Sequence, residues 1–364
     1  MKRKLLLFSV LFGLYVPAEA QVLQSDNFNS LTVGNIGTDF TGTTAGQGGY
    51  YTVSSNGSGT TTTTNSGNAN FQIVAAGGSN LNVFSFQGPN GDQGGRLMWK
   101  NGLPAAWTAR TSGNNILELE VDINPGARGT SRNDFGINVY DAAYSKILVG
   151  VKVDAGTGEL YLMAYSVPPG APVGTPANNY TYSLAAAPGI QLPANQFSRV
   201  GVSFNMTTGA VKIKGPGLPA AGAGLTGSAI GIAPAEADFE SAAGVGPQPG
   251  LAPNTVAATV TMDNFVVRAS ATDTLLGTEA FSSVESSKFT VYPNPVNDIV
   301  KISNGENLQI NKVAITDING RTVKTLDFNG VTETQINVSD LNSGIYFMSI
   351  DTNEGTATQK IIKN

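Results

Sequence analysis

Apolar and polar residues alternate with a period of two along much of the chain, and helical periodicity is rare after the first twenty residues. The clearest example is ILELEVDI, residues 116–123, where apolar side chains alternate with the acids Glu118, Glu120 and Asp122. Alternation of this kind is typical of a strand with one buried face and one solvent-facing side. The pattern predicts an all-β fold, with these three acids on the solvent side.

Two segments predict hairpins of the same design, VKVDAGTGELYL (151–162) and VSFNMTTGAVKI (202–213). In each, a strand is followed by Asp or Asn, two further residues, Thr-Gly and a second strand. The glycine suits the left-handed backbone of a tight turn, and the side chain of Asp154 or Asn205 can accept hydrogen bonds from the turn. Asp154 and Glu159 leave a calcium loop as the alternative, although their spacing does not match an EF-hand.

Composition changes mark the domain organisation. The stretches 166–194 and 214–258 are rich in Pro, Ala and Gly, and loops of this length are either functional or poorly ordered. Clear strand character returns at TVTMDNFVVRA, after which the chain becomes polar. We therefore place a passenger domain at 21–270, a linker at 271–288 and a separate unit at 289–364.

The chain begins MKRKLLLFSVLFGLYVPAEAQ, with three basic residues, an apolar run of 12 residues and Ala-Glu-Ala. These are the parts of a secretory signal peptide, so residues 1–20 are predicted to be removed before Gln21. A membrane anchor or a buried helix is the alternative. Without this segment the net charge moves from −5 to −7, and an acidic exported protein is a poor nucleic-acid binder. No other apolar run is long enough to predict a membrane span.

The 364 residues include no Cys and no His. Catalytic triads based on histidine, cysteine nucleophiles and zinc sites built from thiolates or imidazoles are therefore excluded. No metal or other cofactor is expected from the sequence, although calcium binding by oxygen ligands stays possible. The fold must also be stable without disulfides.

The unit at 289–364 alternates short strands with turns, which predicts a small Ig-like β-sandwich. It contains, in order, YPNP (292–295), DINGR (317–321), GIY (344–346) and the closing QKIIKN (359–364). With these motifs it resembles the C-terminal sorting domain (type A) of the type IX secretion system of Gram-negative bacteria. The residues that carry the predicted sorting signal are Pro293, Asn294, Pro295, Asp317, Gly320, Gly344, Tyr346 and Lys360. An Ig-like spacer or a carbohydrate-binding module is the alternative.

The resemblance implies a two-step export route. The signal peptide takes the chain to the periplasm, and the folded C-terminal unit is then read by the outer-membrane translocon. In the family a sortase-like surface protease removes the unit, and the passenger is released or attached to the cell surface. Asp273-Thr274-Leu275 in the linker also fits the short O-glycosylation pattern of such bacteria.

The passenger resembles concanavalin A-like, or laminin-G-like, jelly rolls. The resemblance rests on SDNFNSLTVGNI (25–36) near its start and TMDNFVVRAS (261–270) at its end, because the terminal strands of that fold pair and carry DNF or DDF sequences. It implies one β-sandwich of about 250 residues. Many domains of this kind bind glycans, and some hydrolyse them.

Laminarinase-like members of that fold carry the pattern Glu-x-Asp-x-(x)-Glu on one strand, where two of the acids act as nucleophile and general acid. Glu118, Glu120 and Asp122 have suitable spacing but differ from it at the middle and last positions. An ordinary strand with its acids in solvent is therefore the favoured interpretation.

The two tryptophans, Trp99 and Trp107, are the candidate ligand-binding residues. They lie in RLMWKNGLPAAWTAR (96–110) and could stack on a sugar, but a lone Trp in a β-sandwich more often belongs to the core. At most one of them is expected to be exposed.

Three functional classes follow. The preferred one is a secreted or surface-bound, non-catalytic jelly roll that binds an extracellular polysaccharide or another ligand. A glycoside hydrolase or lyase that uses the acids of strand 116–123 is the first alternative, and a structural or adhesive surface protein is the second.

Overall fold

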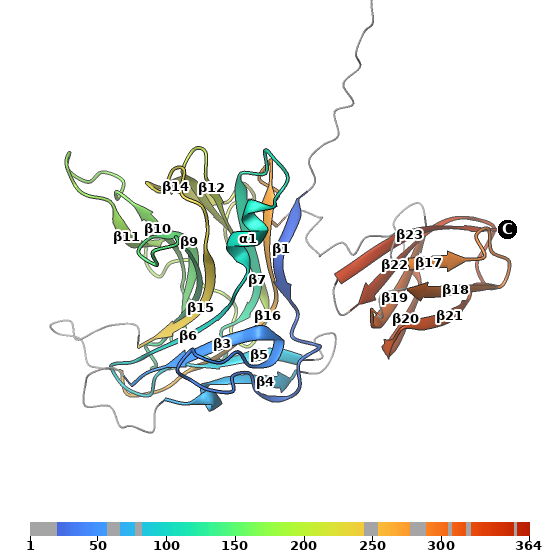
Figure 1. Ribbon diagram of the computed structural model, residues 1–364, viewed down its shortest axis with the longest axis horizontal. Coiled ribbons are helices and arrows are strands. Elements are labelled where there is room, and N and C mark those ends of the chain that lie inside the picture. The colour runs from blue at the N-terminus through green and yellow to red at the C-terminus, as the bar shows by residue number, and fades with distance from the viewer. Residues whose placement is uncertain are drawn as a thin grey trace, which may run out of the picture.

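The alternating pattern builds two large antiparallel sheets from the passenger and two small ones from the C-terminal unit (Figure 1). The structure is a computed structural model that describes residues 20–56, 66–76, 82–243, 254–276, 289–304, 308–317, 322–352 and 355–364. The predicted signal peptide up to residue 19 and the Thr-rich tract at 60–64 lie outside the described residues. The all-β class, a large sandwich followed by a small one, is confirmed.

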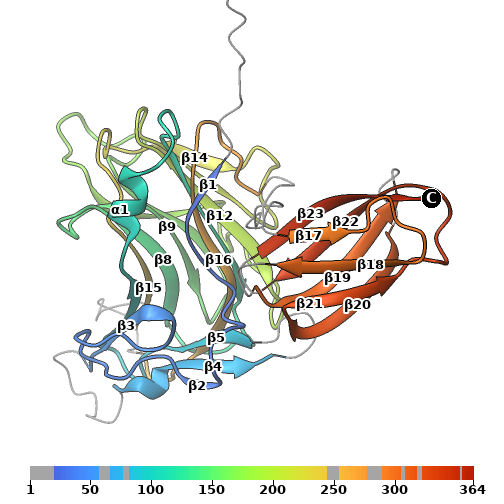
Figure 2. The same cartoon turned by 45° about the vertical axis from the view of Figure 1, so that its right-hand side comes forward.

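The first passenger sheet has nine strands. The first and last strands of the passenger pair within it as predicted, with Asp26 opposite Phe265 (Figure 2). Its order is β14 (Ala223–Thr226), β13 (Ala210–Lys214), β12 (Ser198–Asn205), β7 (Ile116–Asn124), β16 (Thr259–Ser270), β5 (Asn82–Gln87), β4 (Phe71–Ala75) and β2 (Gly34–Asn35), with β1 (Gln21–Asp26) beside β16.

The second passenger sheet has seven strands and faces the first across the core. Its order is β11 (Asn178–Ser183), β10 (Leu160–Ser166), β9 (Ile147–Asp154), β8 (Asp134–Tyr140), β15 (Glu236–Ala242), β6 (Gly95–Lys100) and β3 (Tyr50–Ser54). The helical elements described are α1 (Leu103–Thr108) and the single turns η1 (Gln47–Gly49) and η3 (Asn68–Asn70). Among the described residues, no helix has the length and apolarity needed to cross a membrane.

Aromatic and branched side chains from the inner faces of both sheets form one core. Phe84, from the nine-stranded sheet, meets Phe239, from the seven-stranded sheet, edge to face at 5.5 Å between ring centroids. Phe28 packs on both rings. Each buried aromatic ring removes a large apolar area from water, so this cluster ties the two layers together.

Both predicted hairpins are confirmed. β9 and β10 flank the first turn, where the Asp154 carboxylate accepts from the backbone N–H of Thr157 at 2.7 Å. β12 and β13 flank the second, where Asn205 accepts from the N–H of Thr207 and of Thr208.

The stretches predicted to be irregular contain three strands. β11 lies in 166–194, and β14 and β15 lie in 214–258. Pro, Ala and Gly are abundant around these strands, and this composition concealed the alternation within them. The strand β15 is central to the seven-stranded sheet, where it pairs with both β8 and β6.

The C-terminal unit forms a three-stranded and a four-stranded sheet around its own small core. The first contains β17 (Phe289–Tyr292), β18 (Ile299–Asn304) and β21 (Glu333–Asn337), and the second contains β20 (Thr322–Val331), β19 (Ile310–Asp317), β22 (Gly344–Thr352) and β23 (Gly355–Lys363). The predicted Asn319-Gly320 turn lies outside the described residues, but β19 and β20 pair as a hairpin requires.

The start of the predicted linker belongs to the passenger. We name residues 271–276 the strap, because they lie against the outer side of the nine-stranded sheet. Leu275 is fully buried and lies over Gly201. A Cβ atom added to Gly201 would lie 2.6 Å from the Cδ1 atom of Leu275. The Lys214 ammonium donates to the Leu275 carbonyl at 2.8 Å, and Lys212 pairs with Asp273 at the same distance. The linker therefore starts after Leu276 rather than at 271.

We predict that Leu275→Ala lowers the free energy of unfolding of the passenger by about 2–4 kcal/mol, because the substitution leaves a cavity over Gly201. Denaturant unfolding of residues 21–364 measures the change. Thr272→Ala is the control, since Thr272 is exposed in the same segment. Equal stability of the two variants would contradict the docking of the strap.

Candidate functional site

The acids of strand 116–123 do not face solvent, so the prediction that they lie on the solvent side of the strand is wrong. Glu118 and Glu120 are fully buried, and Asp122 is half-buried. All three do point away from the core, but the strap and two arginines cover them. The outer side of this sheet is therefore a second, polar interior.

Each buried carboxylate is fully engaged. Glu120 pairs with Arg199 at 3.0 Å and with Arg268, and it also accepts from the backbone N–H of Leu276. Glu118 accepts from the hydroxyl and the N–H of Thr274. Burial raises the pKa of Glu118, and the bonds from Thr274 partly offset that rise. Since a catalytic carboxyl must reach substrate, these acids are structural.

The strap also bears on the predicted O-glycosylation pattern. The Thr274 hydroxyl donates to Glu118 at 2.7 Å, and Asp273 pairs with Lys212. A sugar on this oxygen would remove the hydroxyl hydrogen and leave a buried carboxylate short of a donor. The structure therefore disfavours modification at Thr274.

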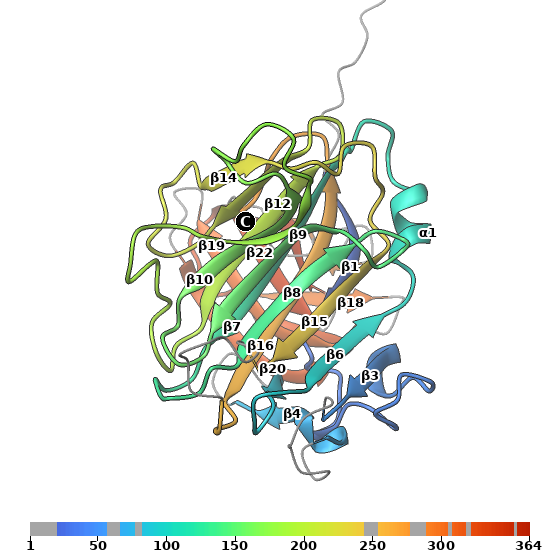
Figure 3. The same cartoon turned by 90° about the vertical axis from the view of Figure 1, so that its left-hand side faces the viewer.

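A cavity of about 310 Å³ lies on the outer side of the seven-stranded sheet, on the opposite side of the sandwich from the strap. Figure 3 looks onto this sheet, where β8, β15 and β6 run side by side. We call this cavity the groove. It is lined by Val53, Leu97, Trp99, Tyr140, Tyr144, Glu236, Asp238 and Glu240.

The sequence EADFE of β15 supplies three acids to the groove. Ala237 and Phe239 are buried in the core, so the alternate positions Glu236, Asp238 and Glu240 point outward. Pairing with β8 places Asp238 opposite Asn138 and Glu236 opposite Tyr140. A central strand is fixed from both sides, which makes it a rigid support for such a constellation.

Aromatic side chains form the rim of the groove. Trp99 is half-buried on β6 and stacks on Tyr51 of β3, with ring centroids 5.6 Å apart and planes 14° apart. Tyr144 reaches in from the β8–β9 turn and is 59% exposed. Trp99 and Tyr144 are therefore partly exposed aromatic rings in the groove, and such rings offer a ligand an apolar surface.

The loop 39–44 backs the tryptophan. Gly42 has φ +75° and so little space that an added Cβ would lie 2.8 Å from the Trp99 ring. The Asp39 carboxylate fixes the loop by accepting from Thr41, Gly42, Thr43 and Thr44. These hydrogen bonds, that of the Thr41 N–H foremost, hold the pKa of Asp39 well below its usual range.

The three carboxyl groups of the groove have different partners. Glu240 accepts from the Tyr140 hydroxyl at 2.6 Å and from the Asn138 amide at 2.9 Å. Glu236 accepts from the Tyr144 hydroxyl at 3.4 Å. Asp238 is 6% exposed and shares a hydrogen bond with Glu236, which is 9% exposed.

Burial raises the pKa of all three acids. For Asp238 the negative charges of Glu236 and Glu240 add to burial and bring the pKa to about 9. The interaction between the two neighbouring carboxyls raises the pKa of Asp238 and lowers that of Glu236. Burial is also the main cause of the raised pKa of Glu240. The groove thus holds a protonated carboxyl beside an acceptor at neutral pH, as acid–base chemistry requires.

One tryptophan is buried and the other is partly exposed, as expected. Trp107 is 3% exposed in α1 and belongs to the core, with the Arg110 guanidinium 4.0 Å from the centre of its ring. It cannot stack on a ligand, which corrects its place among the candidate binding residues. Trp99 lines the groove and keeps that role.

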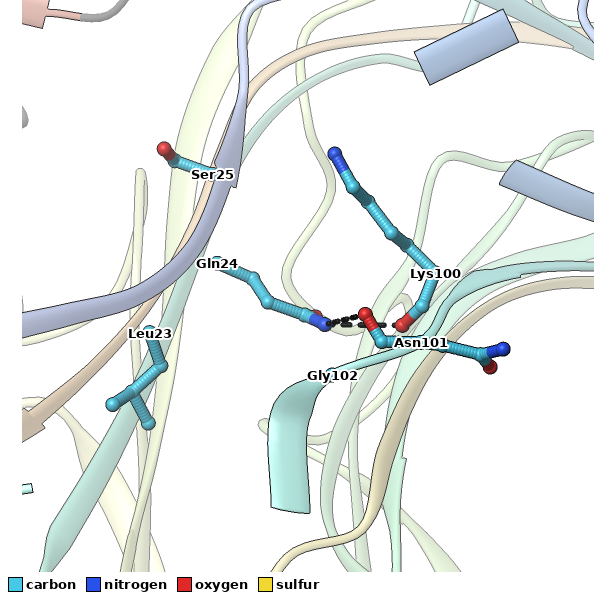
Figure 4. A pocket seen from close by; sticks show the side chains of 6 residues that line it. All are labelled: Leu23, Gln24, Ser25, Lys100, Asn101 and Gly102. Carbon is cyan, nitrogen blue, oxygen red and sulfur yellow. Dashed lines mark hydrogen bonds between the residues drawn. The ribbon is translucent and has the colours of Figure 1, made fainter. Parts of the chain in front are cut away.

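A second, smaller cavity of about 200 Å³ lies where β1 passes the end of β6 (Figure 4). The Gln24 amide points across it and donates to the carbonyls of Lys100 and Asn101. These bonds attach the first strand to the β6–α1 connection, so we regard this cavity as structural. Within the described residues, no group of three or more acidic, His or Cys side chains has the geometry of a metal site.

The groove was missed because strand β15 was missed. EADFE matches the pattern Glu-x-Asp-x-Glu better than ILELEVD does, since both outer positions are Glu and the middle one is Asp. The signal was the alternation of these five residues inside a stretch judged irregular from its composition.

Several predicted sorting residues converge on the last strand. The Asn294 amide donates to the Lys360 carbonyl at 2.7 Å, and its oxygen accepts from the Ile362 N–H at 2.9 Å. Pro293 and Pro295 flank this asparagine between β17 and β18. Hydrogen bonds therefore join the YPNP motif (292–295) to the closing QKIIKN motif (359–364).

The other predicted sorting residues lie along the four-stranded sheet. Tyr346 is buried on β22 and donates to the Asn342 carbonyl at 2.9 Å. Gly344 begins the same strand and Asp317 ends β19. Gly320 lies outside the described residues.

Residues 290–364 match the family described as the secretion system C-terminal sorting domain. This unit is a type IX secretion sorting domain. It implies interaction with the type IX secretion machinery and export to the cell surface or the extracellular space. Comparison with curated proteins gave no match.

Solved structures give distant likenesses. The cellulose induced protein Cip1 is 14% identical, with coverage of 56% of this chain and 85% of that chain and a TM-score of 0.34. A Trypanosoma rangeli sialidase complex is 15% identical, with coverage of 54% and 26% and a TM-score of 0.30. A structure of botulinum neurotoxin type C, whose cell entry is dependent upon interaction with two ganglioside molecules, is 14% identical, with coverage of 93% and 72% and a TM-score of 0.37.

We predict that Asp238→Asn stabilises the protein, and that the gain grows as the pH rises from about 4 to 9. Folding raises the pKa of Asp238 from its ordinary 3.8 to about 9, so the folded state holds a proton that the unfolded state releases. The wild-type protein therefore loses stability across this window, whereas asparagine does not titrate.

Melting temperatures of the variant and the wild-type protein at pH 4.5, 6.5 and 8.5 test this. Asp92→Asn removes an aspartate outside the groove and is the matched control. A difference between Asp238→Asn and the wild-type protein that does not change with pH would contradict the raised pKa of Asp238.

Proposed function

We propose that the passenger is a secreted glycoside hydrolase whose active site is the groove. The observation that carries the proposal is the row of Glu236, Asp238 and Glu240 on one strand, lining one cavity with an aromatic pair beside them. Burial raises the pKa of Asp238 to about 9. Hydrolysis of a glycosidic bond needs one carboxyl group that donates a proton and one that is ionised. The groove supplies both without histidine, cysteine or metal.

The partners of each carboxyl suggest its role. Glu240 is the proposed general acid: burial raises its pKa, and once it has taken up a proton it can donate that proton to the glycosidic oxygen as the bond breaks. Glu236 is the ionised group that acts on the anomeric carbon, directly or through a water. Asp238 is a positioning residue that donates a hydrogen bond to Glu236 and keeps it ionised. Trp99 holds the sugar ring against the strand.

Binding without cleavage is the second candidate function. The stacked pair of Trp99 and Tyr51 favours it, since such a platform binds sugars whatever the carboxyl groups do. Both candidates place an extracellular polysaccharide in the same groove. They differ in whether new reducing ends form.

We predict that Glu236→Gln and Glu240→Gln each lower the rate of glycan cleavage by about 10²–10⁴-fold and leave binding nearly unchanged, because glutamine keeps the shape but cannot transfer a proton or attack carbon. Release of reducing ends from a panel of soluble polysaccharides measures cleavage. Affinity electrophoresis on the same polysaccharides measures binding.

Glu159→Gln is the matched control, because Glu159 lies at the β9–β10 turn outside the groove. Retention without cleavage by the wild-type protein would replace the hydrolase with the binding module. No retention and no cleavage would favour a structural or adhesive surface protein.

For export, we propose that the predicted signal peptide leads to the periplasm and that a sortase-like protease cuts the linker after Leu276. The strap stays on the passenger in this scheme, because it covers Glu118 and Glu120 and holds Leu275. Cleavage beyond it leaves the acid–arginine cluster intact.

Deletion of residues 289–364 is expected to leave the passenger in the periplasm, because the sorting domain is what the type IX machinery reads. Cell fractionation with an antibody against the passenger measures its location, with the full chain in the same strain as control. Passenger found at the surface without this unit would refute the sorting role.

A further inference from the structure

The charged residues that line the groove are all acidic. Its eight lining residues include three acids and neither lysine nor arginine. The nearby cations of this sheet are already paired, Lys152 with Asp134 at 2.8 Å and Lys146 with Asp141 at 3.5 Å. A uronate, sulfate or sialic acid carboxylate entering the groove would meet like charge and find no cation to compensate it.

One acceptor in the groove has no partner. The Oδ1 atom of Asp238 is buried and accepts no hydrogen bond within the described residues, although this carboxyl lines the cavity. A buried polar atom without a partner carries a desolvation cost, which an incoming donor would remove. A ligand that brings a hydrogen-bond donor to this carboxyl would remove that cost.

The residues around the Oδ1 atom of Asp238 indicate which kind of hydrogen-bond donor suits this point of the groove. Trp99, Tyr140 and Tyr144 line the same cavity, and aromatic rings attract cations through their electron-rich faces. Met98 of β6 pairs with Phe239 of β15, so this register continued by one residue places Trp99 and Asp238 at the same level on neighbouring strands. An ammonium group has three donors and the positive charge that carboxyl groups and aromatic rings both favour.

We propose that the groove selects glycans whose sugars carry a free amino group, that is, polymers of unacetylated hexosamine. The sugar ring stacks on Trp99 while its ammonium group donates to Asp238. This inference rests on the proposed function, since it names the substrate class of the same groove. The positive charge of the ligand replaces the cation that the groove lacks.

Binding is measured by calorimetry on residues 21–364 carrying Glu236→Gln, so that hydrolysis does not interfere. The probes are hexamers of glucosamine, N-acetylglucosamine, glucose and galacturonate. We expect the glucosamine hexamer to bind about tenfold or more tightly than the neutral hexamers, and the galacturonate hexamer not to bind measurably. A second substitution, Asp238→Ala, removes the oxygen acceptor and should remove most of the preference for the glucosamine hexamer over the glucose hexamer.

The Trp99→Ala variant distinguishes binding of the glucosamine hexamer in the groove from non-specific attraction of a cationic glycan to an acidic protein. If the glucosamine hexamer binds to this variant and to Asp238→Ala as tightly as to the Glu236→Gln parent, the cation lies elsewhere on the surface and the proposal is overturned. Equal affinity of the Glu236→Gln parent for the glucose and glucosamine hexamers overturns it too. The proposed hydrolase is judged separately, by new reducing ends formed from any of the four hexamers by the protein with Glu236 intact.

Discussion

A carboxyl group that leaves water must find either a cation or a proton, and this constraint divides the passenger into its two sides. On the nine-stranded sheet Glu118 and Glu120 find arginines and backbone donors. On the seven-stranded sheet the acids of β15 line a cavity without a basic residue, and Asp238 keeps its proton instead. The same residue type in the same alternation is structural on one side and chemically available on the other.

The two sides are linked by the core between them. Phe239 sits between Asp238 and Glu240 on β15 and packs on Phe84 and Phe265 of the other sheet. The inward residue that anchors the strand thereby also fixes the outward acids. Because β15 is paired along both edges, the groove does not depend on a long loop for its geometry.

The position of the strap has a consequence for presentation of the groove. The chain leaves the passenger at Leu276, on the outer side of the nine-stranded sheet, whereas the groove lies on the outer side of the other sheet. A passenger held through its C-terminal end therefore keeps the groove on its opposite side. The arginine and lysine contacts of the strap maintain that exit point independently of the sorting domain.

The sequence by itself determined the all-β class, both hairpins, the pairing of the terminal strands and the sorting domain, because these depend on local alternation, turn residues and short motifs. It could not decide which acids are available. Glu118 and Glu120 follow a perfect alternation, yet arginines 79 and 148 residues away from Glu120 in sequence close over them. Asp238 gains its raised pKa from burial between strands that are distant along the chain, and only the tertiary structure brings Trp99 beside it.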